Sequence, residues 1–445
     1  MTVSRTVCLG FLAVITVGAI LLMLPISLAS GEWNNPITAI FTAASAVCVT
    51  GHIVVDTATY FSTFGQIVIL CLIQIGGLGY MIATTLLLLL LGRRRFGLRD
   101  RLALQQVMNR PKLQGIVPLV RSIIATILVF EMTGMFLLML IFGSEHGFYR
   151  GLWYSFFHSV SAWNNAGFSL FSDSLVGYQT SISINLIIAL LVIIGGIGYE
   201  TIFEMTLWLK HLLFRSTRPV SFSLNFRVAV STTAFLLAAG TLSFLLSERN
   251  NAETLGQMDV QGRLLAASFQ SMTARTAGFN SIDIGQMTTA GQFLMIALMF
   301  IGGSPGGTAG GTKTTTFRVI SSCTQAVLQG KEEVQLYERK VPYALILKAI
   351  GVIFGSLMTI TIATLLITLT DPSIEFIRVL FEVVSAFATV GVSTGITAGL
   401  SAAGKLILVA TMYMGRVGIL LLMSALIGDP KPSQVHYPEE FLLVG

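Results

Sequence analysis

Charge is scarce in this sequence. Only 11% of its 445 residues are Asp, Glu, Lys or Arg, whereas 54% are hydrophobic. A soluble domain carries about 25% charged residues, so a chain of this composition could not cover a surface that faces water. A disordered chain would contain far fewer hydrophobic residues and is excluded by the same numbers. The composition therefore predicts a membrane protein that crosses the bilayer several times.

Long runs without any charge support this conclusion. An α-helix needs about 20 apolar residues to cross the hydrocarbon core. The stretches without a charged residue are 6–31, 57–92, 151–172, 174–199, 228–247, 284–312, 349–370 and 383–404. We interpret the first as an uncleaved span, because its apolar run is longer than the roughly 7–15 residues of a signal peptide.

Cysteine and histidine are sparse as well. The four cysteines and five histidines are scattered, and no pair has the spacing of a metal site or of a redox motif. No nucleophile–base pair or metal cluster falls in the spans, which argues against an enzyme. We therefore expect no cofactor in this chain and assign no disulfide.

The basic residues cluster in three connections, at 93–121, 210–227 and 313–348. Cytoplasmic loops carry the excess of Lys and Arg, so we place all three connections and both termini inside the cell. The net charge of +6 then reports topology rather than nucleic-acid binding. Between basic clusters the chain goes out and returns, so each unit has an even number of spans. Such units are related by an axis along the membrane normal.

A fourfold repeat underlies this pattern. Four short segments align and place glycines at 51, 167, 278 and 391, at a nearly constant spacing of 111 to 116 residues. A second glycine-containing element follows each of them after 24 to 28 residues, at 76–79, 195–198, 302–307 and 415–418. We predict repeats at 1–92, 93–215 (opening with the basic linker 93–121), 216–330 and 331–428, followed by a cytoplasmic tail, 429–445.

Each repeat contains a short segment that cannot cross the membrane. These segments are 36–47, 149–162, 260–274 and 372–387, a length typical of re-entrant helices. Asn35-Pro36 and Asp371-Pro372 each place a capping side chain before proline at the first helical position. A helix that dives inward directs its partial negative charge at the membrane centre, where four such ends would attract a cation.

The segments after these helices are candidates for a selectivity filter. Glycine accepts positive φ without steric cost, so successive carbonyls can face one axis and replace the hydration shell of a cation. The alternative is a turn or packing glycine, which four copies at matched offsets disfavour. The candidate filter residues are Val49, Thr50, Gly51, Asn165, Ala166, Gly167, Thr276, Ala277, Gly278, Thr389, Val390 and Gly391.

The four loops read Val-Thr-Gly-His, Asn-Ala-Gly-Phe, Thr-Ala-Gly-Phe and Thr-Val-Gly-Val. They resemble the loops in the membrane subunits of the Ktr/Trk/HKT superfamily of potassium transporters. The resemblance is strongest to the bacterial Ktr membrane subunit. The resemblance covers nearly the whole chain. It implies four span–pore loop–span units around a central pore, with eight transmembrane helices and four re-entrant pore helices in the cell's inner (plasma) membrane. Relatives that prefer sodium often carry Ser where this chain has Gly51. His52 is a departure without an interpretation.

The resemblance also implies partners. Family members form homodimers and bind a cytosolic ring of nucleotide-binding regulatory subunits of the RCK/KTN type. Many of them take up potassium with sodium ion as an activator. Because this chain offers no soluble domain that could bind a nucleotide, we expect regulation to come from such a partner, docked on the connections 93–121 and 313–348 or on the tail.

A glycine-rich segment precedes the third basic connection. It comprises Gly302, Gly303, Ser304, Pro305, Gly306, Gly307, Thr308, Ala309, Gly310 and Gly311. This composition breaks a helix, and it resembles the family's intramembrane loop that occludes the pore beneath the filter. A phosphate-binding loop is excluded, because Thr312 stands where the motif that starts at Gly306 requires Lys.

Isolated charges complete the candidates. Arg416 lies within an apolar run, where a charge is costly and usually functional. It resembles the family's gate arginine, and the alternative is that its side chain snorkels to the inner surface.

Three aspartates follow the candidate filter glycines by five or six residues: Asp56, Asp173 and Asp283. They could form a cation-concentrating vestibule or serve as turn and cap residues. Glu131, mid-span, could pair with Arg121 or sit at a subunit contact.

Three functions stay open on these grounds. The first is a potassium-translocating pore subunit with a carbonyl filter and a glycine-rich gate. The second is a sodium-preferring relative of the same architecture. The third is a secondary transporter whose glycine loops only pack helices together, and which would have no central cation site.

Overall fold

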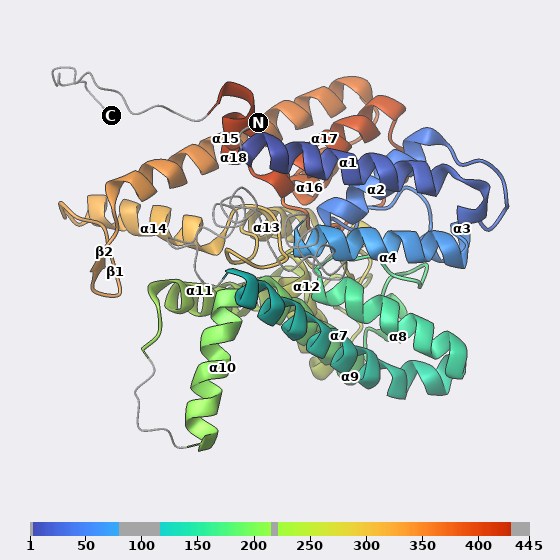
Figure 1. Ribbon diagram of the computed structural model, residues 1–445, viewed down its shortest axis with the longest axis horizontal. Coiled ribbons are helices and arrows are strands. Elements are labelled where there is room, and N and C mark those ends of the chain that lie inside the picture. The colour runs from blue at the N-terminus through green and yellow to red at the C-terminus, as the bar shows by residue number, and fades with distance from the viewer. Residues whose placement is uncertain (1–2, 80–115, 215–220, 429–445) are drawn as a thin grey trace.

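The computed structural model describes residues 3–79, 116–214 and 221–428. Most of the basic linker 93–121, the tail 429–445 and the predicted repeat boundaries near 92 and 215 lie outside these residues. The described chain is almost entirely helical (Figure 1). In this part of the chain the only paired strands are β1 (Gln335–Leu336) and β2 (Arg339–Lys340), which form a small antiparallel ribbon. The all-α class is confirmed.

One order of helices occurs four times. A long apolar helix comes first, and these helices are α1 (Val3–Met23), α7 (Ile116–His146), α11 (Leu224–Glu248) and α15 (Tyr343–Thr370). A short helix follows: α2 (Pro36–Cys48), α8 (Phe148–Trp163), α12 (Val260–Thr273) and α16 (Phe376–Phe387). A closing helix ends each unit: α4 (Thr63–Leu78), α9 (Ile182–Gly196), α13 (Thr289–Phe300) and α17 (Ala402–Val417).

Smaller elements complete the described chain, some within the units and some between them. They are α3 (Thr57–Tyr60), α10 (Tyr199–Phe214), α14 (Thr314–Leu328) and α18 (Ile419–Ile427), with short 3₁₀ turns at Pro25–Ser27, Val176–Tyr178, Ile284–Gln286 and Thr397–Gly399. α10 projects from the rest of the molecule in Figure 1.

Several helices are suited to a bilayer. Within the described residues, the four long helices are each apolar and long enough to cross a membrane. Two further pairs, α9 with α10 and α17 with α18, pass the same test together but bend by 108° and 95° at the break between them. α4 and α13 are shorter apolar helices. The chain is therefore a multi-pass membrane protein with bent, re-entrant-like helix pairs.

The glycine elements explain why the closing helices are short. Gly79 and Gly418 follow α4 and α17 directly, with φ of 73° and 87°, and Gly198 separates α9 from α10 with φ of 96°. A side chain is strained at such angles, whereas glycine is not. Each of these three helices stops or turns at its second glycine element.

The same elements pack each closing helix against the short helix of its own repeat. A Cβ atom added to the glycine would lie about 2 Å from a backbone carbonyl oxygen at the end of the short helix, a distance no side chain could occupy. The distances are 2.1 Å from Gly76 to Val47, 2.0 Å from Gly195 to Trp163 and 1.8 Å from Gly415 to Phe387. The second glycine elements at 76–79, 195–198 and 415–418 are thus packing sites.

The predicted short helices are present, with one error in their boundaries. Asn35 caps α2 as expected, because its Oδ1 accepts a hydrogen bond of 2.9 Å from Ile37 N. The expected start at Asp371-Pro372 is wrong, since α16 begins at Phe376. The Asp371 carboxylate instead accepts hydrogen bonds from the backbone N and the Oγ of Ser401, both at 2.8 Å, and joins the end of α15 to the start of α17.

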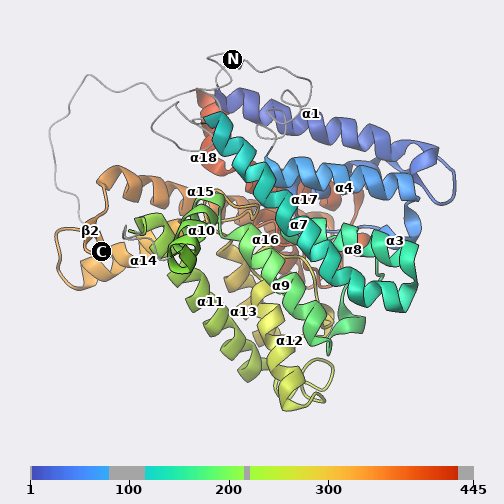
Figure 2. The ribbon, with the colours of Figure 1, turned by 60° about the horizontal axis from the view of Figure 1, so that its bottom comes forward.

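The four units close into a ring. The closing helix of each repeat contacts the short helix of the next, α4 on α8, α9 on α12 and α13 on α16, and α17 returns to α2. The first long helix also lies beside the last helix, α18 (Figures 1 and 2). Ser4 Oγ lies 2.9 Å from Ser424 Oγ, and Arg5 Nε donates to the Ala425 carbonyl over 2.7 Å. The seam between the first and last repeats is thus closed without a covalent link.

We expect Gly415→Ala to destabilise the protein by about 1–3 kcal/mol, because the added methyl group would overlap the Phe387 carbonyl. Thermal unfolding in detergent should show a lower Tm. Gly399→Ala is the matched control, since an added Cβ there has no atom within 4 Å. Equal Tm values for the two variants would contradict the packing assigned to Gly415.

Candidate functional site: four loops at the centre of the ring

The loops that follow the short helices meet at one place. The glycines at their centres are all buried, and each lies so close to the next loop that no side chain would fit. An added Cβ atom would lie 2.5 Å from Ala166 O for Gly51, 2.5 Å from Gly278 Cα for Gly167, 2.8 Å from Val390 O for Gly278 and 1.9 Å from Thr50 O for Gly391. Going around the centre, the loops therefore occur in the order of the repeats.

All four loops share one unusual backbone conformation. The glycines take the left-handed conformation that we expected, with φ between 68° and 91°. Two residues earlier a second left-handed residue occurs that is not glycine: Val49 (56°), Asn165 (58°), Thr276 (67°) and Thr389 (52°). Positive φ is a genuine outlier for a β-branched residue. Strain repeated four times at one centre is typical of a functional site, and the sequence did not predict it.

Buried hydroxyl groups hold these loops in place. Ser45 Oγ and Ser385 Oγ accept hydrogen bonds of 3.1 Å from the backbone N of Gly51 and Gly391. The hydroxyls of Ser161, Thr273 and Ser385 donate to the carbonyls of Phe168, Phe279 and Val392. Each short helix thus uses the same position to fix the loop that follows it, which stabilises the strained backbone.

A second polar position lies three residues earlier on the short helices. In repeats 2 to 4 it carries His158, Gln270 and Glu382, all buried. Each of them bonds to a serine just beyond the central glycine of its loop. The bonds run from His158 Nε2 to Ser169 Oγ at 2.9 Å, from Gln270 Nε2 to Ser281 Oγ at 3.3 Å and from Ser393 Oγ to Glu382 Oε1 at 2.5 Å. The constant spacing was the signal in the sequence that could have revealed this layer.

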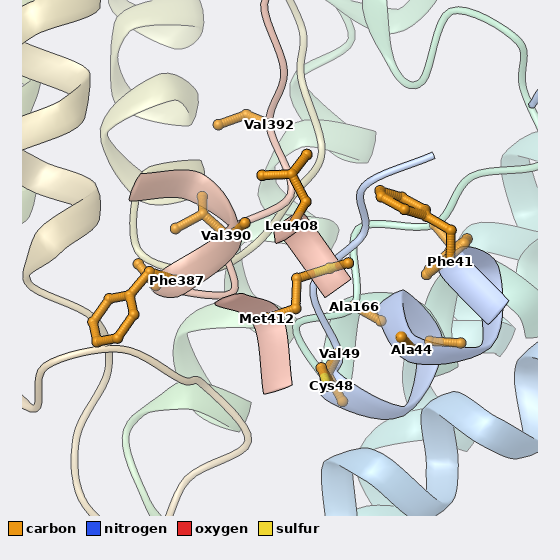
Figure 3. Close-up of a cluster of buried hydrophobic side chains, with 14 of the residues drawn as sticks. Phe41, Ala44, Cys48, Val49, Ala166, Phe387, Val390, Val392, Leu408 and Met412 are labelled. Atoms are coloured by element: carbon orange, nitrogen blue, oxygen red, sulfur yellow. The ribbon is translucent and has the colours of Figure 1, made fainter. Parts of the chain in front are cut away.

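Apolar packing surrounds the loops. Figure 3 shows Val49, Ala166 and Val390, which come from three different repeats, among buried side chains that include Leu408 and Met412. All five side chains are at most 1% exposed. Close packing of this kind leaves the loops little freedom to move apart.

The glycine-rich segment lies against the loops, on the side where the short helices end. Thr308 Oγ1 donates to Asn165 Oδ1 over 2.8 Å, and an added Cβ on Gly310 would lie 2.0 Å from Thr389 Oγ1. The ends of the segment meet, because Gly302 N donates to Thr312 O over 2.9 Å. The segment is thus a closed loop that touches the filter candidates of repeats 2 and 4.

Three cationic side chains hold this loop. Arg416 donates to the Thr308 carbonyl and to the Gly76 carbonyl of repeat 1. Arg275 Nη2 donates to Gly302 O over 3.2 Å, and Lys313 Nζ donates to Ala309 O over 2.7 Å. In the described chain none of the three forms an ion pair with a carboxylate. The hydrogen bonds of Arg416 to two backbone carbonyls favour a role within the protein over snorkelling to the inner surface. Sequence reasoning missed Arg275 and Lys313, although each is a charge beside an apolar run.

The three aspartates beyond the loops act as caps. Asp56 accepts from Ala58 N and Asp283 from Gly285 N, at 3.0 and 2.9 Å, where each caps a short helical turn. Asp173 accepts from Gly177 N at 2.9 Å. The turn-and-cap interpretation is thus confirmed, and the carboxylates of Asp173 and Asp283 remain exposed.

Glu131 lies buried in α7. Its Oε1 accepts a hydrogen bond of 3.1 Å from Asn164 Nδ2, at the end of α8, and its backbone carbonyl accepts one of 2.6 Å from Ser159 Oγ. The described residues supply no basic partner for it. Pairing with Arg121 is therefore wrong, and Glu131 instead joins the long and short helices of repeat 2.

Comparison with known proteins defines the class. Residues 6–436 match the TrkH family of cation transport proteins. The fold resembles that of the potassium transporter TrkH from Vibrio parahaemolyticus, with a TM-score of 0.72 and 17% identity over 95% of this chain and 85% of that one.

Similar sequences extend over the full length. The chain is 38% identical to the Ktr system potassium uptake protein B of Bacillus subtilis, covering 100% of this chain and 97% of that protein. It is 36% identical to the potassium/sodium uptake protein NtpJ of Enterococcus hirae, over 99% of this chain and 97% of that protein. The chain therefore belongs to the TrkH family and is a multi-pass cation transporter rather than an enzyme.

We expect Arg416→Leu to loosen the glycine-rich loop, because two carbonyls lose a charged donor. Hydrogen exchange at the loop amides of Gly302, Ser304 and Thr308, which bond to other backbone carbonyls, should accelerate about tenfold, the effect of one lost charged hydrogen bond. Arg378→Leu, which removes an exposed ion pair with Glu375, is the control. Unchanged exchange in Arg416→Leu would refute the anchoring role.

Proposed function

We propose that this chain is the ion-translocating subunit of a Ktr-type potassium uptake system. The observation that carries the proposal is the meeting of four loops, each with two left-handed residues, at the centre of a ring of short helices. The names of the B. subtilis and Vibrio alginolyticus relatives, both Ktr system potassium uptake protein B, support the substrate. Eight spans and four pore helices around a central pore complete the proposed architecture.

The filter would work through backbone carbonyls. Left-handed residues at alternate positions allow successive carbonyls of residues 49–51, 165–167, 276–278 and 389–391 to face one axis, where they replace water around a potassium ion. The C-terminal ends of α2, α8, α12 and α16 lie next to these residues and add partial negative charge. No carboxylate ring is required. The exposed Asp173 and Asp283, with Asp56, would raise the cation concentration at the outer entrance.

The glycine-rich loop would act as the gate. Residues 302–311 touch the loops of repeats 2 and 4 and carry the bonds from Arg275, Lys313 and Arg416. A loop held there by three positive charges both obstructs a cation path and raises its electrostatic barrier. Opening would require the loop to leave these donors.

Regulation would come from outside the chain. We place both termini and the basic connections in the cytoplasm, where a ring of nucleotide-binding subunits would dock, and we infer a homodimer in the cell membrane, with sodium ion as an activator. A sodium-accepting transporter is the second candidate, favoured by the name of the E. hirae relative. A secondary transporter without a filter is disfavoured, because it gives no reason for four converging, strained loops.

Gly51→Ser tests the filter. The serine would take a strained φ near 91° and meet the Ala166 carbonyl, so the ring of carbonyls must deform. We expect discrimination of potassium over sodium to fall by about tenfold or more, since selectivity depends on the coordinating carbonyls. Uptake by an uptake-deficient bacterium, with sodium as competitor, measures this, and Gly399→Ser is the control. Intact selectivity would argue against a four-glycine filter.

Deleting 303–310 tests the gate. If the loop obstructs the path, maximal potassium flux per molecule should rise several-fold, while the filter keeps its preference for potassium. Flux into proteoliposomes of the purified transporter, normalised to the amount of protein, measures this. An unchanged maximal flux would contradict the gate assignment and leave the filter assignment standing.

A further inference from the structure

A buried histidine crosses the seam between the first and last repeats. His52 follows the filter glycine Gly51 and is 0% exposed. Its Nε2 lies 3.0 Å from Ser385 Oγ, 3.2 Å from the Val392 carbonyl oxygen and 3.4 Å from Glu382 Oε2. All three partners belong to repeat 4, so the histidine joins two filter loops that are far apart in sequence.

The roles of donor and acceptor in this contact are fixed by chemistry. A carbonyl oxygen and a carboxylate only accept hydrogen bonds, so Nε2 must carry the hydrogen. Ser385 Oγ donates its own hydrogen to the Val392 carbonyl over 2.7 Å, and therefore also accepts from the histidine. The same Ser385 Oγ accepts from Gly391 N. His52 thus bonds to the hydroxyl that fixes the fourth filter loop.

Glu382 holds the segment beyond that loop. Its Oε1 accepts from Ser393 Oγ at 2.5 Å and from Thr394 N at 2.9 Å, and its Oε2 accepts from Thr397 Oγ1 at 2.9 Å. The carboxylate is 1% exposed and is satisfied by donors on both oxygens. A buried carboxylate that is held by donors on both oxygens favours one geometry of the segment around it.

The other junctions of the ring are joined differently in the described chain. Asn165 Nδ2 donates to Thr276 Oγ1 over 3.5 Å between the second and third loops, and Ser172 Oγ donates to Asp56 Oδ2 over 2.6 Å between repeats 1 and 2, but neither junction has a buried histidine beside a carboxylate. The residues that correspond to His52 are Phe168, Phe279 and Val392, all apolar. In repeats 2 and 3 the residues that correspond to Glu382 bond to a serine of their own repeat, as Glu382 does, but in the described chain neither also hydrogen-bonds to the neighbouring repeat. Consecutive repeats are also joined by the chain itself, whereas repeats 4 and 1 are not. The histidine stands at the one junction that lacks a covalent connection.

We propose that His52 and Glu382 form a clamp across this seam, which sets the separation of the first and fourth filter loops and thereby the ion specificity of the pore. Both are positioning residues, because they act on the filter through Ser385 and Val392 and not on the ion. The inference rests on the proposed function of the loops as a filter. Without the clamp, the seam is free to widen, and the carbonyls of these two loops fit a potassium ion less closely.

His52→Phe tests the clamp, because phenylalanine is the residue that repeats 2 and 3 use at this position. We expect discrimination of potassium over sodium to fall about tenfold, the effect of one lost hydrogen bond to a charged group, with the KM for potassium rising and maximal flux per molecule nearly unchanged. His52→Gln, whose amide can donate to the same acceptors, should restore most of the discrimination. Both are measured on the complete transport system in cells, by competition uptake.

Two further variants keep the test decisive. Glu382→Gln retains the shape of the side chain but replaces one accepting oxygen with an amide group that donates, and this group would face other donors. We therefore expect it to lose discrimination of potassium over sodium, as His52→Phe does. It tests the clamp even if His52→Phe fails to reach the membrane. His146→Phe, at an exposed histidine at the end of α7 that bonds to Tyr178 and not to a candidate filter residue, is the control and should change neither quantity.

The outcomes separate the clamp from the filter itself. A fall in maximal flux for both ions at unchanged selectivity would overturn the clamp and leave only a structural role. If Gly51→Ser changes selectivity and His52→Phe does not, the clamp fails and the filter stands. If neither changes selectivity, the proposed filter fails.

Discussion

Close approach of four backbone segments at the ring's centre is the constraint on which the rest of the structure depends. Each central glycine lies so near the next loop that even a methyl group would overlap backbone atoms. Such an approach needs short helices that stop at the same depth, closing helices that pack on their carbonyl ends, and a seam that holds without a covalent link. Strained residues at Val49, Thr276 and Thr389 persist because buried hydroxyls and tight packing determine their backbone.

Much of the helical architecture could be predicted from the sequence, because a pattern that is weak in one segment becomes significant when it occurs in four repeats. The spacing of Gly51 and its counterparts located the short helices within a few residues, and apolar runs located the long helices. Side-chain contacts between repeats could not be predicted, since they depend on how units far apart in sequence come together. Arg275 and Lys313 were therefore missed. Asp371 was misread as a cap for the helix after it, whereas its carboxylate bonds to Ser401, the residue that caps the closing helix of its repeat.

The structure also separates the two glycine series by their physical roles. The first series, at the centre, requires positive φ and the absence of a side chain at once. The second series supplies close contact between helices at Gly76, Gly195 and Gly415, and in repeat 3 it has become the start of the glycine-rich loop. In repeat 3 the packing site is thus replaced by a segment that contacts two of the central loops and accepts hydrogen bonds from three cationic side chains. This asymmetry would allow a fourfold scaffold to carry the single gate that we propose.

The central claim is that the four loops surround a site for a desolvated potassium ion. An anomalous-scattering map from crystals grown with rubidium in place of potassium tests it most directly. The account predicts anomalous density on the axis enclosed by residues 49–51, 165–167, 276–278 and 389–391. Crystals that diffract well but show no density there, or show it only elsewhere in the protein, would contradict the account.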